Sequence, residues 1–189
     1  MIKEAQRVSM ETSYGRIIAE IFVAQAPATA RNFLHYVDLG LYESASFYRA
    51  VRPDIDERSP RIQVLQGGID RTCRNAPLPP VMHESTDVTG LRHVDGALSA
   101  VRWEPGSASS EFFIVIDDTP ELDFSGKRNP DGQGFAVFGQ VITGMEIVRR
   151  INARPTGTDE TIGFLKNQAL LPPDMMRVTR WVQPVSDRT

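Results

Sequence analysis

The sequence predicts an all-β fold, a barrel or a sandwich, with helical caps. Two observations support this prediction. Short runs with the alternation of β-strands recur along the chain between Gly- or Pro-containing turns, and only two segments show helical periodicity. The 189 residues fit a single domain of ordinary size, spanning 1–189.

Strands are expected in the segments where apolar residues alternate with polar ones or form a short continuous run. These segments are 7–12, 16–22, 46–51, 62–66, 97–101, 111–116, 136–141 and 175–182. They are short and evenly distributed, as in barrels and sandwiches.

Two helices are expected, at 27–39 and 144–151. The first contains Ala30, Phe33, Leu34 and Val37 at the i, i+3, i+4, i+7 spacing, and Gly40 suits the left-handed position after its end. The second has apolar residues three apart and two arginines near its C-terminus, where cations complement the helix dipole.

Three connections, 52–61, 70–96 and 120–134, are longer than a compact β protein needs to join its strands. Long loops on a rigid scaffold often carry functional residues. The segment 155–173 is expected to be a weak, partly polar connector leading into the last strand.

Composition excludes several classes of protein. Hydrophobic residues make up 41% and charged residues 24%, and the net charge is −3 without blocks of like charge, so neither a nucleic-acid nor a membrane partner is expected. Cys73 is the single cysteine, and the three histidines show no metal-ligand spacing. Residues 1–12 lack an apolar segment, which predicts a cytoplasmic protein if Met1 is native and permits a periplasmic one if a signal peptide was removed.

The segment 46–51, Ser-Phe-Tyr-Arg-Ala-Val, places an arginine on an apolar strand face. A period of two puts Phe47, Arg49 and Val51 on the same side. A charged side chain on a buried face needs a partner. A structural ion pair, a snorkelling edge arginine and a functional cation all remain open.

Two further segments combine strand patterns with polar residues. In 62–68, Ile62, Val64 and Gln66 share a face before a double glycine, so the Gln66 amide either bonds nearby backbone or contacts a ligand. In 107–114, Glu111 and Phe113 face one way, and that face is either core or the floor of a pocket.

The chain also contains residues from which a hydrolase site could be built, namely Ser110, Glu111 and His93. No G-x-S-x-G elbow frames the serine, and no histidine falls at a recognisable partner position. The sequence therefore disfavours nucleophilic catalysis.

Read together, these segments resemble the cyclophilin family of peptidyl-prolyl cis-trans isomerases. The resemblance covers 8–152 and leaves 153–189 as a C-terminal connector and last strand. It runs through G-R-I-x-x-E-I-F (15–22), A-P-x-T-x-x-N-F (26–33), G-L-Y (40–42), F-Y-R-A-V (47–51), Q-G-G (66–68), G-A-L-S-A (96–100), S-S-E-F-F-I (109–114), L-D (122–123), F-G-Q-V (138–141) and G-M-E-I-V (144–148).

The resemblance implies an eight-stranded antiparallel β-barrel closed by two α-helices, and an enzyme that rotates X-Pro peptide bonds without a metal or cofactor. Arg49, Gln66 and Phe113 are the implied catalytic residues. The implied substrate contacts are Tyr48, Val64, Ala100, Val101, Arg102, Trp103, Glu111, Leu122 and Phe135. Proline-containing peptides or unfolded proteins are the expected partners of a monomeric chain.

Several positions differ from the common family pattern. Tyr48 and Phe135 stand where many members have histidine, Glu111 where they have glutamine, and Glu121 where they have Trp or Phe. Arg102 and the inserted stretch 124–133 resemble bacterial members. These changes leave open a second function, a module that binds proline-containing segments with little catalysis. Glu111 is expected near Arg49, where it either orients the guanidinium or competes for it.

Overall fold

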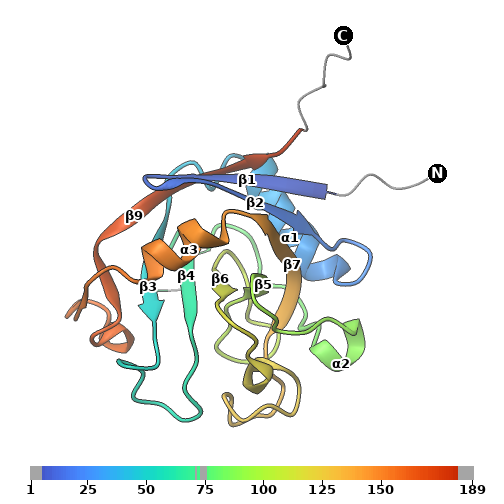
Figure 1. The fold of residues 1–189 in the computed structure, drawn as a ribbon. Coiled ribbons are helices and arrows are strands. Elements are labelled where there is room, and N and C mark those ends of the chain that lie inside the picture. Colours follow the sequence, from blue (N-terminus) through green and yellow to red (C-terminus); the bar gives the residue numbers. More distant parts are fainter. Residues whose placement is uncertain (1–5, 71, 73–75, 183–189) are drawn as a thin grey trace.

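A computed structural model describes residues 6–70, 72 and 76–182 (Figure 1). Cys73 lies outside the described residues. One antiparallel sheet has the strand order β1-β2-β7-β5-β6-β4-β3-β9-β8, and a further pairing of β1 with β9 closes it. The result is an eight-stranded barrel with the short strand β8 added beside β9, which confirms the predicted fold class.

The strands occupy nearly the predicted segments. Their bounds are β1 Gln6–Thr12, β2 Gly15–Ile21, β3 Ala45–Val51, β4 Val64–Gly68, β5 Ala97–Ala100, β6 Phe112–Val115, β7 Ala136–Thr143, β8 Thr156–Gly157 and β9 Ala169–Arg180. Beyond the eight expected segments, only the two-residue strand β8 was not predicted.

Two main helices, α1 Pro27–Asp38 and α3 Met145–Asn152, confirm the helical predictions. Helix α1 packs against β7 and β9, and α3 packs against β2, β3 and β4. Gly40 takes the left-handed conformation, with φ 69°, directly after the C-cap of α1. The short elements α2 Thr86–Thr89, η1 Pro120–Leu122 and η2 Gly163–Leu165 lie in the long connections.

The first turn of α1 is capped from a distant part of the chain. The buried Glu84 carboxylate accepts hydrogen bonds from the backbone N–H groups of Ala28 and Thr29, at 3.0 and 2.8 Å, and from the Thr29 hydroxyl at 2.7 Å. A negative charge suits the positive end of the helix dipole. The 70–96 connection is thereby tied to the barrel.

The apolar residues form a main core and a second cluster on the other side of the sheet. Along β6, Phe112 and Ile114 belong to the main core, whereas Phe113 and Val115 belong to the second cluster. Alternate residues of a strand point to opposite faces, so β6 has one face in the barrel interior and one facing outward. The outward face forms the floor of the functional site.

The predicted strand face of 46–51 is wrong in part. Phe47 lies in the main core, whereas Val51 lies in the second cluster and Arg49 lines the cavity beside it. The register of β3 against β4 shifts between Phe47 and Arg49. A β-bulge adds one residue to a strand and reverses the faces beyond it, which is why period two fails here.

The prediction of a weak connector at 155–173 is also wrong. Leu165, Ala169 and Leu170 are fully buried, and two of them pack around Tyr48. Strand β9 already begins at Ala169 and pairs with both β3 and β8. A segment that looked polar in sequence therefore completes one wall of the barrel.

Candidate active site

A cavity of about 490 Å³ lies over the outward face of β4 and β6. Nine of the twelve predicted site residues line it: Arg49, Val64, Gln66, Val101, Arg102, Trp103, Phe113, Leu122 and Phe135. The other three, Tyr48, Ala100 and Glu111, are outside the lining. Ala100 belongs to the main core, and Tyr48 and Glu111 are buried behind the cavity wall.

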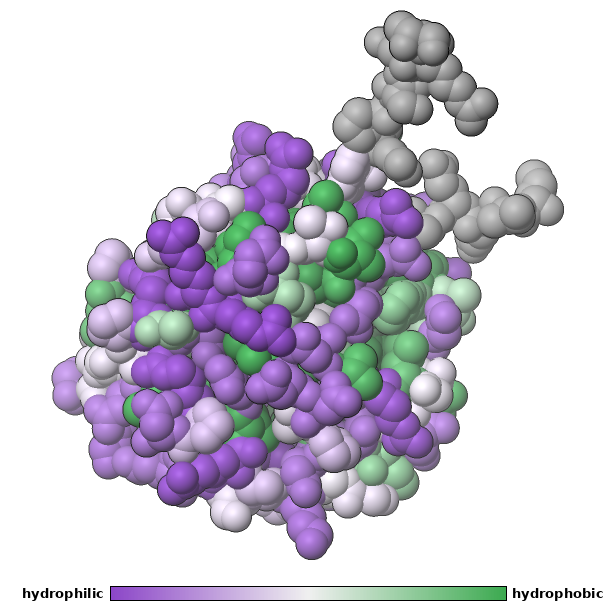
Figure 2. Space-filling view, viewed as in Figure 1, coloured by the Kyte–Doolittle hydropathy of each residue, from purple (hydrophilic) through white to green (hydrophobic). Residues whose placement is uncertain are grey.

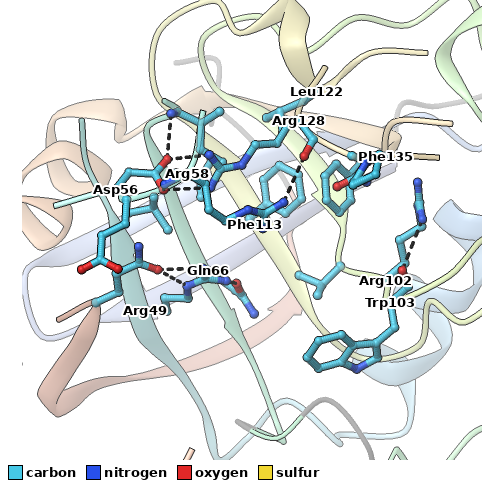
Figure 3. A pocket seen from close by; sticks show the side chains of 18 of the residues that line it. Arg49, Asp56, Arg58, Gln66, Arg102, Trp103, Phe113, Leu122, Arg128 and Phe135 are labelled. Atoms are coloured by element: carbon cyan, nitrogen blue, oxygen red, sulfur yellow. Dashed lines mark hydrogen bonds and ion pairs between the residues drawn. The ribbon is translucent and has the colours of Figure 1, made fainter. Parts of the chain in front are cut away.

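The Arg49 guanidinium is held in the cavity wall by two amide side chains. Its Nη1 donates to Gln66 Oε1 at 2.9 Å, and its Nε and Nη2 both donate to Gln168 Oε1, at 2.9 and 2.7 Å (Figure 3). Amide oxygens orient a guanidinium without neutralising its charge. These contacts favour a functional cation over the alternative of a structural ion pair.

Gln66 is oriented in turn by a buried tyrosine and a buried carboxyl group. The Gln66 amide donates to Tyr48 Oη at 2.8 Å, and Tyr48 Oη donates to Glu111 Oε2 at 2.7 Å. Tyr48 and Gln66 thus connect Glu111 to Arg49. This arrangement favours the interpretation in which Glu111 helps to orient the arginine.

The Glu111 carboxyl group occupies space left by a glycine. A Cβ atom at Gly68, whose φ is +154°, would overlap the carboxyl group. The backbone N–H groups of Ile69 and Asp70 donate to Glu111 Oε1 at 2.8 and 2.9 Å. Burial raises the pKa of Glu111 to about 7, against the opposing effect of the hydrogen bonds from Tyr48, Ser110 and these N–H groups.

An apolar pocket lies beside Arg49. The rings of Phe113 and Phe135 meet edge to face with centroids 5.2 Å apart, and fully buried Leu122 lies in the same cluster. The guanidinium carbon of Arg102 is 5.4 Å from the centroid of the Phe135 ring. Rings in this arrangement form a rigid, water-poor surface suited to a small apolar ring.

His93 supports this pocket from behind and does not serve Ser110. Its ring stacks against Phe113 at 6.1 Å, with Nδ1 2.8 Å from Asp123 Oδ1 and Nε2 2.9 Å from Ser99 Oγ. Burial lowers the pKa of His93 against the opposing effect of Asp123. Because His93 is only 2% exposed, the structure gives the hydrolase hypothesis no accessible base.

Arg102 and Trp103 form the opposite edge of the cavity (Figure 3). Arg102 donates to both carboxylate oxygens of Asp131, at 2.8 and 2.9 Å, and to the carbonyl of Gly134 at 2.8 Å. The hydrogen bonds from Arg102 lower the pKa of Asp131. Trp103 remains 54% exposed, so its indole is accessible to a ligand.

Sequence reasoning missed Gln168 and the charged residues of two long loops. Gln168 lies in the segment expected to be a connector, while Asp56, Arg58 and Arg128 come from 52–61 and 120–134. The unusual length of these loops was the available signal. Among the described residues, no group of three or more His, Cys, Asp or Glu could hold a metal ion. No helix in the described ranges is long and apolar enough to cross a bilayer.

The closed barrel and its cavity, with an arginine oriented by amides beside an aromatic pocket, agree with the cyclophilin resemblance of the sequence. Residues 7–174 match the family model described as cyclophilin type peptidyl-prolyl cis-trans isomerase/CLD. The chain therefore belongs to the cyclophilin-type peptidyl-prolyl cis-trans isomerase family, as its sequence motifs predict.

Curated relatives and solved structures agree with this assignment. The chain is 34% identical over 154 residues to a peptidyl-prolyl cis-trans isomerase of Streptomyces antibioticus, covering 80% of this chain and 86% of that one. It is 32% identical over 152 residues to peptidyl-prolyl cis-trans isomerase B of Escherichia coli, covering 79% and 86%. A cyclophilin-type isomerase structure from Cryptosporidium parvum has the same fold, with a TM-score of 0.73 at 20% identity, covering 95% of this chain and 99% of that one.

Proposed function

We propose that the cavity binds a proline-containing segment and that Arg49 catalyses its cis-trans isomerisation by donating a hydrogen bond to the proline nitrogen. The observation that carries this proposal is the Arg49 guanidinium, held by Gln66 and Gln168 in the wall of a cavity that also contains the Phe113–Phe135 pocket. The family assignment supports the isomerase over a module that only binds proline.

The chemistry needs no nucleophile. Amide resonance gives the peptide bond a rotational barrier of about 18–20 kcal/mol. When the bond twists, the nitrogen lone pair no longer conjugates with the carbonyl and becomes a hydrogen-bond acceptor. A donor that is already in position then binds the twisted state more tightly than either planar state.

The remaining pocket residues hold the substrate around that nitrogen. Phe113, Leu122, Phe135 and Val64 form the apolar surface for the proline ring, and Gln66 contacts the peptide backbone. An acceleration of about 10⁵ corresponds to about 7 kcal/mol. The pocket and Gln66 contribute by holding the reacting bond next to Arg49, and Gln168 contributes by orienting the Arg49 guanidinium.

The partners we propose are proline-containing peptides and unfolded protein clients, bound by a monomeric, single-domain chain. In support, the structure of the Cryptosporidium parvum cyclophilin has been solved in the presence of the dipeptide Ala-Pro. Figure 2 shows the hydrophobic residues of one face in several groups, with hydrophilic residues between them.

An exchange experiment tests the proposed function. Two-dimensional NMR exchange on an Ala-Ala-Pro-Ala peptide should show cis and trans proline signals that interconvert faster when the protein is added in catalytic amount. The acceleration should persist in EDTA. A peptide that binds, as seen from shifted signals, but exchanges at its uncatalysed rate would establish the binding-module alternative instead.

Replacing Gln168 with alanine should lower kcat/KM by about tenfold, or about 1.4 kcal/mol. The substitution removes the acceptor for two Arg49 N–H groups, so the guanidinium loses its fixed orientation. As a positioning residue, Gln168 should affect kcat more than KM. In an Arg49→Ala background the same substitution should have almost no further effect on rate, because the two residues act together. If the losses in kcat/KM from the two substitutions were additive, Gln168 would not act by positioning Arg49.

Replacing Trp103 with alanine should change the preference for the residue before proline. The exposed indole borders the cavity, and its removal should raise the relative kcat/KM for peptides with bulky residues at that position. Trp181→Ala is the matched control because Trp181 is outside the cavity lining. An unchanged ranking of peptides with Trp103→Ala would show that Trp103 only packs at the rim.

A further inference from the structure

The loops 52–61 and 120–134 form a charged wall beside the aromatic pocket. Asp56, Glu57 and Arg58 come from the first loop, and Arg128 and Asp131 from the second; all line the cavity. Figure 3 shows Arg58 extending toward the Arg128 backbone, on the same side of the cavity as Phe113 and Leu122. The reaction as described above uses none of these charges.

A buried ion pair holds the two loops together. Asp56 is 3% exposed and Arg128 is 4% exposed, and Arg128 Nη1 lies 2.8 Å from Asp56 Oδ2. Asp56 also accepts hydrogen bonds from the backbone N–H groups of Arg58 and Ile62, at 3.2 and 3.1 Å. Burial opposes ionisation, yet the hydrogen bonds from Arg128 and the backbone lower the pKa of Asp56. The backbone that carries Arg58 is therefore anchored.

Each acidic residue of the lining already has a cationic partner. Asp56 pairs with Arg128, Asp131 with Arg102, and Glu57 with Lys166 at 3.5 Å. The lining contains five cations (Arg49, Arg58, Arg102, Arg128 and Lys166) against these three acids. Three of these cations are thus paired with the three acids, and Arg58 is paired with none of them.

Arg58 therefore carries a charge that no acid of this wall compensates, whereas the Arg49 guanidinium is oriented by Gln66 and Gln168. Its Nη2 donates to the carbonyl of Arg128 at 3.0 Å, and within the described ranges no carboxylate lies within ion-pair distance of it. Burial, followed by the nearby Arg128 charge, lowers the pKa of Arg58, while Asp56 opposes this. An anion bound beside Arg58 would relieve this electrostatic cost.

The position of Arg58 indicates which part of a peptide it meets. In the proposed binding mode, the proline ring packs on Phe113 and the residues before proline lie beside Trp103, whereas Arg58 lies on the other side of the pocket (Figure 3). The chain that follows proline therefore leads to Arg58. Resting on the proposed function, we propose that Arg58 is a specificity residue that selects peptides carrying a carboxylate just after the proline, from an acidic side chain or a free C-terminus.

A series of matched peptides tests this proposal. Ala-Ala-Pro-X-Ala-amide peptides with X as Glu, Gln or Lys are compared by NMR exchange, together with Ala-Ala-Pro-Ala as the free acid and the amide. We expect kcat/KM to be about threefold higher for Glu than for Gln, with Lys lowest, as for a partly exposed ion pair. The preference should shrink in 0.5 M NaCl. For Ala-Ala-Pro-Ala, kcat/KM should likewise be higher for the free acid than for the amide, because the free acid carries a carboxylate just after the proline.

Two variants assign the effect to one residue. Arg58→Gln should bring the ratio of kcat/KM for the Glu peptide to kcat/KM for the Gln peptide down to about one. Arg61→Gln removes the same charge from the same loop but outside the cavity lining, and should keep the preference. Equal rates for all peptides, or a preference that survives Arg58→Gln, would overturn the proposal. Failure of the proposed function would look different, because no peptide would be isomerised.

Discussion

Arg49→Ala is expected to lower kcat/KM for prolyl isomerisation by about 10²–10³, or about 3–4 kcal/mol. This is the loss found when one preorganised donor to a transition state is removed. The donor is valuable because its acceptor, the lone pair of the twisted proline nitrogen, is absent in both planar states. An NMR exchange assay with a proline peptide measures the effect directly.

The same substitution should change the stability of the fold much less than it changes the activity. Arg49 is half-buried, and its described partners are the side chains of Gln66 and Gln168. Both amides lie at the cavity and can bond water after the substitution. Thermal unfolding of Arg49→Ala should therefore stay close to that of the parent protein. A folded Arg49→Ala protein that catalyses at the parent rate would refute the mechanism.

Arg52, the residue directly after β3, provides a matched control. It is outside the cavity lining, and its Nη1 donates to the backbone carbonyls of Asn152 and Arg154, at 2.6 and 3.2 Å. Arg52→Ala should lower the melting temperature because those carbonyls lose their partner. Its folded fraction should retain the parent rate. Arg49→Ala is thus expected to lower mainly the activity, and Arg52→Ala mainly the stability.

Glu111 is expected to make the protein less stable as the pH rises toward 8. Its pKa is about 7 in the folded state, against an ordinary value of 4.5 for a glutamate. Well below pH 4.5 the Glu111 carboxyl group is protonated in both the folded and the unfolded protein, so its burial does not make the stability depend on pH. Between pH 4.5 and pH 7 the unfolded chain releases this proton while the folded protein retains it, so the free energy of unfolding falls by about 2–3 kcal/mol between pH 5 and pH 8.

Urea unfolding of Glu111→Gln at the two pH values measures this loss. Glutamine does not ionise, so the variant should lose about 2–3 kcal/mol less of its free energy of unfolding than the parent protein between pH 5 and pH 8. Glu104→Gln removes a charge from an exposed residue and should leave the pH dependence unchanged. If Glu111→Gln retained the full pH dependence, burial would not raise the pKa of this carboxyl group.

Local sequence patterns predicted most of the fold. The helix at 27–39 and the strand at 136–141 needed only apolar spacing and turn residues, because the strongest preferences of these segments are local. The ordered motifs around Arg49, Gln66 and Phe113 then identified the family. Those three residues line one cavity, although 17 positions separate Arg49 from Gln66 and 47 separate Gln66 from Phe113.

Predictions from the sequence failed where a structural feature depends on the packing of several segments against one another. The bulge between Phe47 and Arg49 depends on the pairing of β3 with β4 and β9, and no pattern inside 46–51 reveals it. The partly polar 155–173 segment is ordered by the apolar wall around Tyr48. Neither register nor burial is a property of one segment alone.

By itself, the sequence determined the element types, the family and most of the predicted site residues that line the cavity. Only the tertiary structure decided that Gln168 orients Arg49, that Tyr48 and Gln66 connect Glu111 to the guanidinium, and that Arg58 lies in the cavity wall. Local patterns specify strands and helices because those preferences act over a few residues. Hydrogen bonds and charge compensation depend on the distance between atoms that are far apart in sequence, and the closed barrel sets those distances.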